Sequence, residues 1–201
     1  MRCPACQLPL HEFAPACAHC SFDLAVAARI FGAPPQMEFP LTDPAGAIGP
    51  AKKRAVTMAL LEMSQTFPQL SFAAVLVQVD AQIPLPAHTF WLFNTGGLTA
   101  PQESGGLCRL VLLELDVTNS RAACMIGYGL EPFIPQTVLD RIAAAALPDL
   151  QRQDHAAAIL AALQCARTEF AAVAETITRG FGLSVGGQTA GARSEEAAFA
   201  Y

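Results

Sequence analysis

Two pairs of cysteines near the start of the chain limit what this end of the protein can fold into more than any other feature. Cys3 and Cys6 form a first CxxC pair, Cys17 and Cys20 form a second, and ten residues separate the pairs. Two residues between cysteines allow both sulfurs to reach one metal ion, and four thiolates complete a tetrahedral zinc site. The pattern therefore predicts a structural zinc ion bound by all four cysteines.

Two other interpretations of the same cysteines stay open. An iron ion in a rubredoxin-like site would use the same four sulfurs, and four free thiols in an unfolded segment would need no metal. His11 and His19 lie close enough in the sequence to act as substitute ligands, but we expect them to face solvent. Because residues 1–22 contain few large apolar side chains, we expect metal binding to supply the folding free energy of a ribbon over this segment.

The composition of the chain sets limits on its partners and its compartment. With 53% hydrophobic and 14% charged residues among 201, the chain can bury a core of ordinary size. The net charge of −5, without a basic cluster beyond residues 52–54, argues against nucleic acid as a partner. We expect no membrane span, because the longest apolar runs fall well short of about 20 residues. Paired and scattered cysteines without a signal peptide predict a cytoplasmic protein with reduced thiols.

Proline and glycine residues, together with the spacing of apolar residues, divide the chain into four segments. A ribbon over 1–22 precedes a short helix and proline-rich linker over 23–40, an α/β domain over 41–180 and a flexible tail over 181–201. Helical spacing predicts helices near 23–31, 56–67, 86–94, 136–147 and 154–179, and apolar runs predict strands at 71–79, 108–115 and 122–126. We expect Pro148 to close the fourth helix and 99–106 to form a loop.

The lengths of the connections predict how the strands pair. A helical crossover between the first two strands makes them parallel, whereas the few residues at 118–120 make the second and third strands a hairpin. Helices on both sides would then cover a small mixed sheet. The predicted fold class is an α/β sandwich preceded by a zinc ribbon.

The third expected strand leads into a distinctive pentapeptide, which consists of Gly127, Tyr128, Gly129, Leu130 and Glu131. This GYGLE sequence resembles the signature of the TPM domain family. Other short motifs resemble those of the family more weakly, and they occur along the chain in the same order as in the family. These motifs are Leu41-Thr42-Asp43, Trp91 with Gly96 and Gly97, Ser104-Gly105-Gly106, Arg121, and Pro148 with Asp154. The resemblance covers about residues 41–179.

Membership of the TPM family would imply an α/β/α sandwich found in photosystem repair factors, in a receptor-associated membrane protein and in many bacterial proteins. The resemblance implies phosphatase activity, as suggested for some members, or metal binding, as suggested for others. The chain departs from the family at the hairpin, where Asn119 or Ser120 stands in place of an acidic residue. The turn at 104–106 also lacks the usual Asn or Asp.

Asp43 and Glu131 are the candidate ligands of a second cation. Two carboxylates together with backbone carbonyls would form a weak site for calcium or magnesium. The alternative is structural, since Gly127 and Gly129 can serve a sharp turn and a carboxylate at residue 131 suits a helix entry. Nucleophilic catalysis has little support, because Cys108, Cys124 and Cys165 lie in apolar segments and no His-containing triad is marked.

Two classes of function follow from these observations. The first is a non-enzymatic binding, assembly or quality-control module, in which the ribbon and the TPM-like domain bind protein partners. The second is a metal-dependent, phosphatase-like hydrolase that uses Asp43 and Glu131. We favour the first, because such a hydrolase needs several carboxylates or histidines that converge on its metal.

Overall fold

The computed structural model of the protein describes residues 2–11, 14–98 and 106–180. At its centre lies a four-stranded sheet in the order β1-β2-β3-β4. The strands are β1 (Leu41–Thr42), β2 (Ser71–Val77), β3 (Leu110–Asp116) and β4 (Arg121–Ile126). The first three strands are parallel and β4 returns antiparallel to β3, which confirms the predicted crossover and hairpin. Most of the loop expected at 99–106 and the tail at 181–201 lie outside the described residues.

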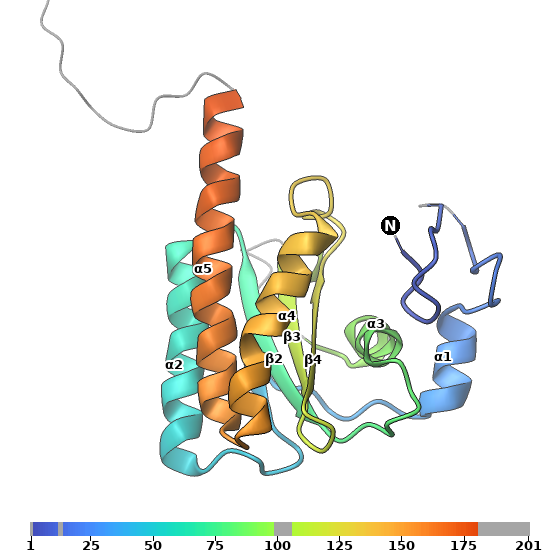
Figure 1. The fold of residues 1–201 in the computed structure, drawn as a ribbon, viewed down its shortest axis with the longest axis horizontal. Coiled ribbons are helices and arrows are strands. Elements are labelled where there is room, and N and C mark those ends of the chain that lie inside the picture. The colour runs from blue at the N-terminus through green and yellow to red at the C-terminus, as the bar shows by residue number, and fades with distance from the viewer. Residues whose placement is uncertain (1, 12–13, 99–105, 181–201) are drawn as a thin grey trace, which may run out of the picture.

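Helices cover both faces of the sheet (Figure 1). They are α1 (Leu24–Phe31), α2 (Pro50–Thr66), α3 (Leu85–Thr95), α4 (Gln136–Gln151) and α5 (His155–Gly180), with a short 3-10 helix η2 (Gly106–Arg109) before β3. The α2, α4 and α5 helices lie on one face, whereas α3 lies on the other with α1 outside it. The α/β fold class predicted from the sequence is confirmed.

The alternation of side chains along the strands produces two separate cores. Phe72, Ala74 and Leu76 of β2 pack with α2, α4 and α5, whereas Ala73 and Val75 face α3. Every residue of β2 is buried, because helices cover both sides of a mostly parallel sheet. This double burial explains why β2 reads in the sequence as one continuous apolar run.

Three local features differ from the sequence-based expectations. The short strand β1 was not predicted, because two residues carry no periodic signal. The second expected strand begins at Leu110, since residues 106–109 form η2. The prediction that Pro148 ends its helix is wrong: α4 continues to Gln151, and the burial of Leu150 in the core holds this last turn in place.

The helix α5 is the one described helix that is long and apolar enough to cross a membrane by length and composition. The most apolar window within His155–Arg179 has a mean hydropathy of 1.3, and 39% of this window is buried inside the molecule. The buried side chains include Ile159, Ala162 and Phe170, which pack in the core with α2 and α4. The same apolar character therefore also serves packing within the domain.

Candidate metal centre

Each cysteine pair lies on a tight backbone turn, and the two turns have the same construction. In the first turn the N–H of Gln7 donates to the carbonyl of Cys3 at 2.9 Å, and in the second the N–H of Ser21 donates to the carbonyl of Cys17 at 2.8 Å. Gln7 and Ser21, which follow the second cysteine of each pair, have positive φ angles of 61° and 56°. The two turns thus bring the sulfurs of both pairs toward a common point.

The four sulfurs form a compact cluster of the size that a metal ion requires. The Sγ atoms of Cys3 and Cys20 are 3.7 Å apart, and so are those of Cys6 and Cys17. All four Sγ atoms lie within 4.8 Å of one another. Sulfurs at 2.3 Å from a central zinc ion in a tetrahedron would be about 3.8 Å apart. The cluster therefore fits a tetrahedral metal site, and four ligands leave no open position on the metal.

The thiols of the cluster do not ionise equally. Backbone N–H groups of Cys20 and His19 lower the pKa of the Cys17 thiol to about 6. The N–H of Phe22 also lowers the pKa of Cys20, but burial and the neighbouring thiols outweigh it and raise this pKa to about 12. Four adjacent thiolates repel one another, so a bound cation is needed to hold all of them deprotonated. Both histidines named as substitute ligands, His11 and His19, are exposed.

The cysteine ribbon, defined as the described residues before α1, packs directly against the α/β domain. Cys3 and Cys17 are buried in the same core as α3, and the rings of Phe22 and Phe90 lie 6.0 Å apart. The carboxylate of Asp23 then caps α1 by accepting a hydrogen bond from the N–H of Val26 at 2.6 Å. The ribbon therefore docks on α3 through side chains next to its cysteines, so that loss of a metal would also weaken this contact.

The structure does not bring Asp43 and Glu131 together. Thr42 pairs with Val75, so Asp43 lies toward the carboxyl end of β2, whereas β4 returns Glu131 to the level of Leu110 at the other end of the sheet. About five residue steps along the strands, or roughly 16 Å, separate the two levels. The structure therefore separates the two residues expected to share a calcium or magnesium ion, because the hairpin reverses the chain between them.

The carboxylate of Asp43 has a structural role instead. It accepts hydrogen bonds from the backbone N–H groups of Ala47 at 2.9 Å and Ile48 at 3.1 Å. These bonds close the loop that connects β1 to α2. An aspartate is favoured in such loops because its short side chain can satisfy nearby backbone donors.

The GYGLE segment owes its glycines to a close approach between two backbones. A Cβ atom on Gly127 would lie 2.0 Å from the carbonyl oxygen of Leu107, and one on Gly129 would lie 2.9 Å from that of Cys108. The N–H of Gly129 donates to this Cys108 oxygen at 2.9 Å. Since neither glycine has a positive φ, the space needed beside η2 explains them better than the expected freedom to turn.

A polar network at the hairpin was only partly visible in the sequence. Asp116 is fully buried, and its Oδ2 accepts hydrogen bonds from Arg121 Nε at 2.9 Å and Nη2 at 2.6 Å and from Asn119 Nδ2 at 2.9 Å. Burial opposes ionisation of Asp116, but Asn119 and Arg121 outweigh it and lower the pKa. Arg121 Nη1 also donates to the carbonyl of Ile83 at 2.8 Å, which holds the loop after β2 against the hairpin.

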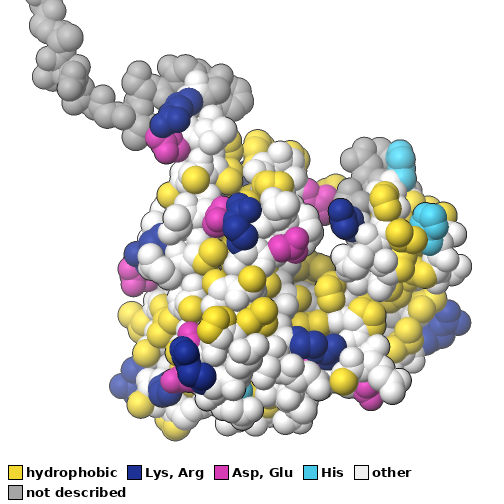
Figure 2. Space-filling model, in the orientation of Figure 1, with side chains coloured by type: hydrophobic (Ala, Val, Ile, Leu, Met, Phe, Trp, Pro, Cys, Tyr) yellow, Lys and Arg dark blue, Asp and Glu magenta, His cyan; other side chains and the backbone are white. Residues whose placement is uncertain are grey.

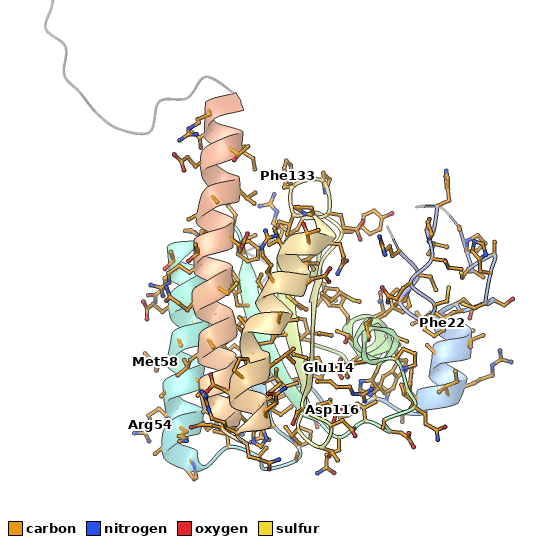
Figure 3. All side chains as sticks on the ribbon, viewed as in Figure 1. Phe22, Arg54, Met58, Glu114, Asp116 and Phe133 are labelled. Carbon is orange, nitrogen blue, oxygen red and sulfur yellow. The ribbon has the colours of Figure 1, made fainter. Side chains whose placement is uncertain are left out.

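Sequence reasoning missed a second buried carboxylate on the same strand. Glu114 is 0% exposed, and its Oε1 lies 2.5 Å from Nδ1 of His88 on α3. Figure 3 labels Glu114 and Asp116 near one end of the sheet and Phe133 at the opposite end. The available signal was a glutamate at a central position of an apolar strand, where a charged residue needs a buried partner.

Two of the three cysteines outside the ribbon, Cys124 and Cys165, do not resemble activated nucleophiles. Burial raises the pKa of Cys124 to about 12, and burial also raises the pKa of Cys165. Cys108 is exposed beside the GYGLE segment. Among the described residues, the cysteine ribbon holds the only group of three or more His, Cys, Asp or Glu side chains whose ligand atoms cluster.

Comparison with known proteins finds solved structures with a low sequence identity to this chain. No protein-family model matches the chain, and no curated protein matches its sequence. The N-terminal domain of the cg2496 protein from Corynebacterium glutamicum is 16% identical, with a TM-score of 0.47 over 81% of this chain and 94% of that one. The N-terminal domain of a P. gingivalis protein is 18% identical, with a TM-score of 0.45 over 78% and 90%. The BA42 protein from Bizionia argentinensis is 11% identical, with a TM-score of 0.47 over 63% and 83%.

Proposed function

We propose that the protein is a non-enzymatic binding or assembly module of the TPM type, in which a zinc ion holds the fold of an N-terminal ribbon that packs against the α/β domain. The observation that carries the proposal is the cluster of four Sγ atoms within 4.8 Å of one another. Cys3, Cys6, Cys17 and Cys20 would hold the zinc ion. A metal with four thiolate ligands acts in stability and not in catalysis, since no position remains for water or substrate.

The TPM assignment is supported by the order of motifs and by their places in the fold. The GYGLE segment follows β4 directly, and Arg121 opens that strand beside the hairpin turn. Asp43 follows β1 in the loop that leads to α2. These placements agree with a compact α/β/α domain of that family.

Protein partners are the proposed ligands of this module in a reducing, cytoplasmic setting. Three large apolar side chains of the ribbon and α1 are exposed, namely Leu8, Leu24 and Ile30. In Figure 2, hydrophobic side chains gather over this part of the molecule, which lies at the right of the view. Exposed apolar residues on the ribbon and on α1 favour association with another protein surface.

The hydrolase alternative is less well supported, because the fold separates its two proposed catalytic carboxylates. Its test is release of phosphate from p-nitrophenyl phosphate by the wild-type protein and by Asp43→Ala and Glu131→Ala, with and without added Mg²⁺. If the protein is a binding module, none of the three proteins should release phosphate faster than buffer without protein. Release by the wild type that either substitution abolishes would show that the non-enzymatic assignment is incorrect.

A further inference from the structure

An exposed apolar surface lies on the outer side of α2 and α5, and we call it the α2/α5 face. Met58 and Leu61 of α2 are 61% and 37% exposed, and Leu160 of α5 is 40% exposed. Figure 3 labels Met58 on the side of α2 that points away from the sheet. An open hollow of about 180 Å³ separates the two helices here, and its lining consists of Lys52, Ala55, Asp154, Ala156, Ala157 and Leu160.

Two ion pairs cross this face, one toward each end. Lys52 Nζ lies 2.9 Å from Asp154 Oδ2, and Arg167 Nη2 lies 3.0 Å from Glu62 Oε1. Because residue 52 pairs with 154 and residue 62 with 167, the two helices run in the same direction. Along α2 the charge is therefore positive and then negative, whereas along α5 it is negative and then positive. Met58 lies near the middle of this pattern.

The four charged side chains are still available to a second molecule, because each is at least 40% exposed. Their pattern is complementary to itself. A two-fold axis in the plane of the face brings Lys52 against Glu62 of a second copy if the axis runs across the helices, or against Asp154 of that copy if it runs along them. The exposed Arg54 adds a positive charge at the Lys52 end.

The size of the face sets the strength of association that it can support. The 17 residues of α2 span about 25 Å, and packed helices lie about 10 Å apart, so the two helices present roughly 500 Å². Two copies would bury roughly 1,000 Å² in total, which is at the lower limit for specific interfaces. Such an interface favours a dimer that forms at micromolar concentrations.

We propose that the α2/α5 face binds a second copy of this chain in a two-fold symmetric dimer. Met58 and Leu160 pack near the centre of the interface, and the four charges form its polar rim. A foreign protein would need a matching pattern of charges, which a second copy supplies by symmetry. The proposal does not depend on zinc or on the ribbon, because α1 and α3 lie on the opposite face of the sheet (Figure 1).

Sedimentation equilibrium of the full-length protein between about 1 and 200 μM measures this association. We expect the mass to rise from that of one chain, 21.2 kDa, toward twice that value, with a Kd between about 1 and 100 μM. The Kd should increase at least about threefold between about 0.05 and 0.5 M NaCl, because salt screens the exposed charges of the rim. Protein that keeps the mass of one chain at the highest concentration would overturn the proposal.

Matched substitutions locate the interface. Met58→Glu places a charge at the centre of the face without entering the core, and it should raise the Kd at least about tenfold. Ile30→Glu is the control, since Ile30 is 58% exposed on α1, and its Kd should stay within about twofold of wild type. Far-UV circular dichroism would check that both variants fold as the wild type does.

A second pair of variants tests the charges. Lys52→Glu should raise the Kd at least about threefold, because the new carboxylate faces an acidic side chain of the second copy under either two-fold axis. Arg29→Glu on α1 makes the same change of charge outside the face and should leave the Kd unchanged. A dimer that survives Met58→Glu, or that Ile30→Glu abolishes, would refute the proposed face.

Discussion

Replacing Arg121 by Met probes the network that connects the hairpin to the loop after β2. Arg121 supplies two of the hydrogen bonds to Asp116 Oδ2, at 2.9 and 2.6 Å, and its side chain is 27% exposed while Asp116 is 0% exposed. Methionine keeps the length and apolar stem of the arginine but removes the charge. The substitution therefore leaves a buried carboxylate with Asn119 as its main side-chain partner.

The expected loss of stability is large for a residue that is partly exposed. Removing one partner of a buried ion pair costs about 3–5 kcal/mol, because the other charge remains desolvated. With a urea m-value of about 2 kcal/mol/M, the midpoint of unfolding should fall by about 2 M. Asp116→Asn/Arg121→Met should lose less than Arg121→Met alone, since the double substitution removes the unpaired charge as well.

The loss in Arg121→Met should also depend on pH. In the wild type the pKa of Asp116 is lowered, so its stabilising contribution is present above the ordinary value of about 3.9 and is lost as pH falls through the native pKa. Without the guanidinium, the pKa of the buried carboxyl rises, and protonation then relieves its cost as pH falls. The free energy difference between wild type and Arg121→Met should therefore be smaller at pH 5 than at pH 7.

Urea unfolding followed by circular dichroism at both pH values measures these differences. Asp116→Asn serves as the control, because it removes the carboxylate charge and should show no such recovery at pH 5. A loss below about 1 kcal/mol for Arg121→Met at pH 7 would contradict the inferred burial of an ionised Asp116. So would a loss that is equal at the two pH values.

Three further results are expected. Gly127→Ala should lower the free energy of unfolding by at least about 3 kcal/mol, because the new Cβ would lie 2.0 Å from a backbone carbonyl oxygen. Gly49→Ala is the control, since its Cβ would meet nothing within 4 Å. It should change the free energy of unfolding by less than about 1 kcal/mol in the same urea assay. Lys52→Ala should leave the urea midpoint unchanged, since the lysine side chain is 60% exposed in its ion pair. Removal of the metal with a chelator should shift Trp91 emission to the red, because α1 then separates from α3; unchanged emission would show that the ribbon stays docked without metal.

The sequence was sufficient to predict the fold where local signals agree with packing. The apolar run of β2, the Gly96 stop after α3 and the short turn at 118–120 each have one physical interpretation, and each was found. The cysteine spacing likewise predicted the cluster, because the CxxC pair constrains geometry within a few residues. Helix α4 was expected to end early, since burial of Leu150 depends on tertiary contacts.

The parts that could not be predicted depend on contacts between distant segments. No local pattern pairs Glu114 with His88, because the two residues meet only when α3 packs on β3. The GYGLE glycines could be found but not explained, since the clash that requires them comes from η2. The open hollow beside Trp91 is also absent from any local signal, as its lining comes from α1, β2, α3 and the segments between them.

Metal content per chain, measured by elemental analysis on purified protein, is the most direct test of the proposed zinc ribbon. We predict one zinc ion per chain in the wild type, its loss in Cys17→Ser, and full retention in Cys165→Ser, whose thiol lies outside the cluster. Iron in place of zinc would show that the four cysteines bind a metal ion, but that the ion is not zinc. Metal-free protein with an unchanged fold, or zinc retained in Cys17→Ser, would contradict a ribbon held by four cysteine ligands.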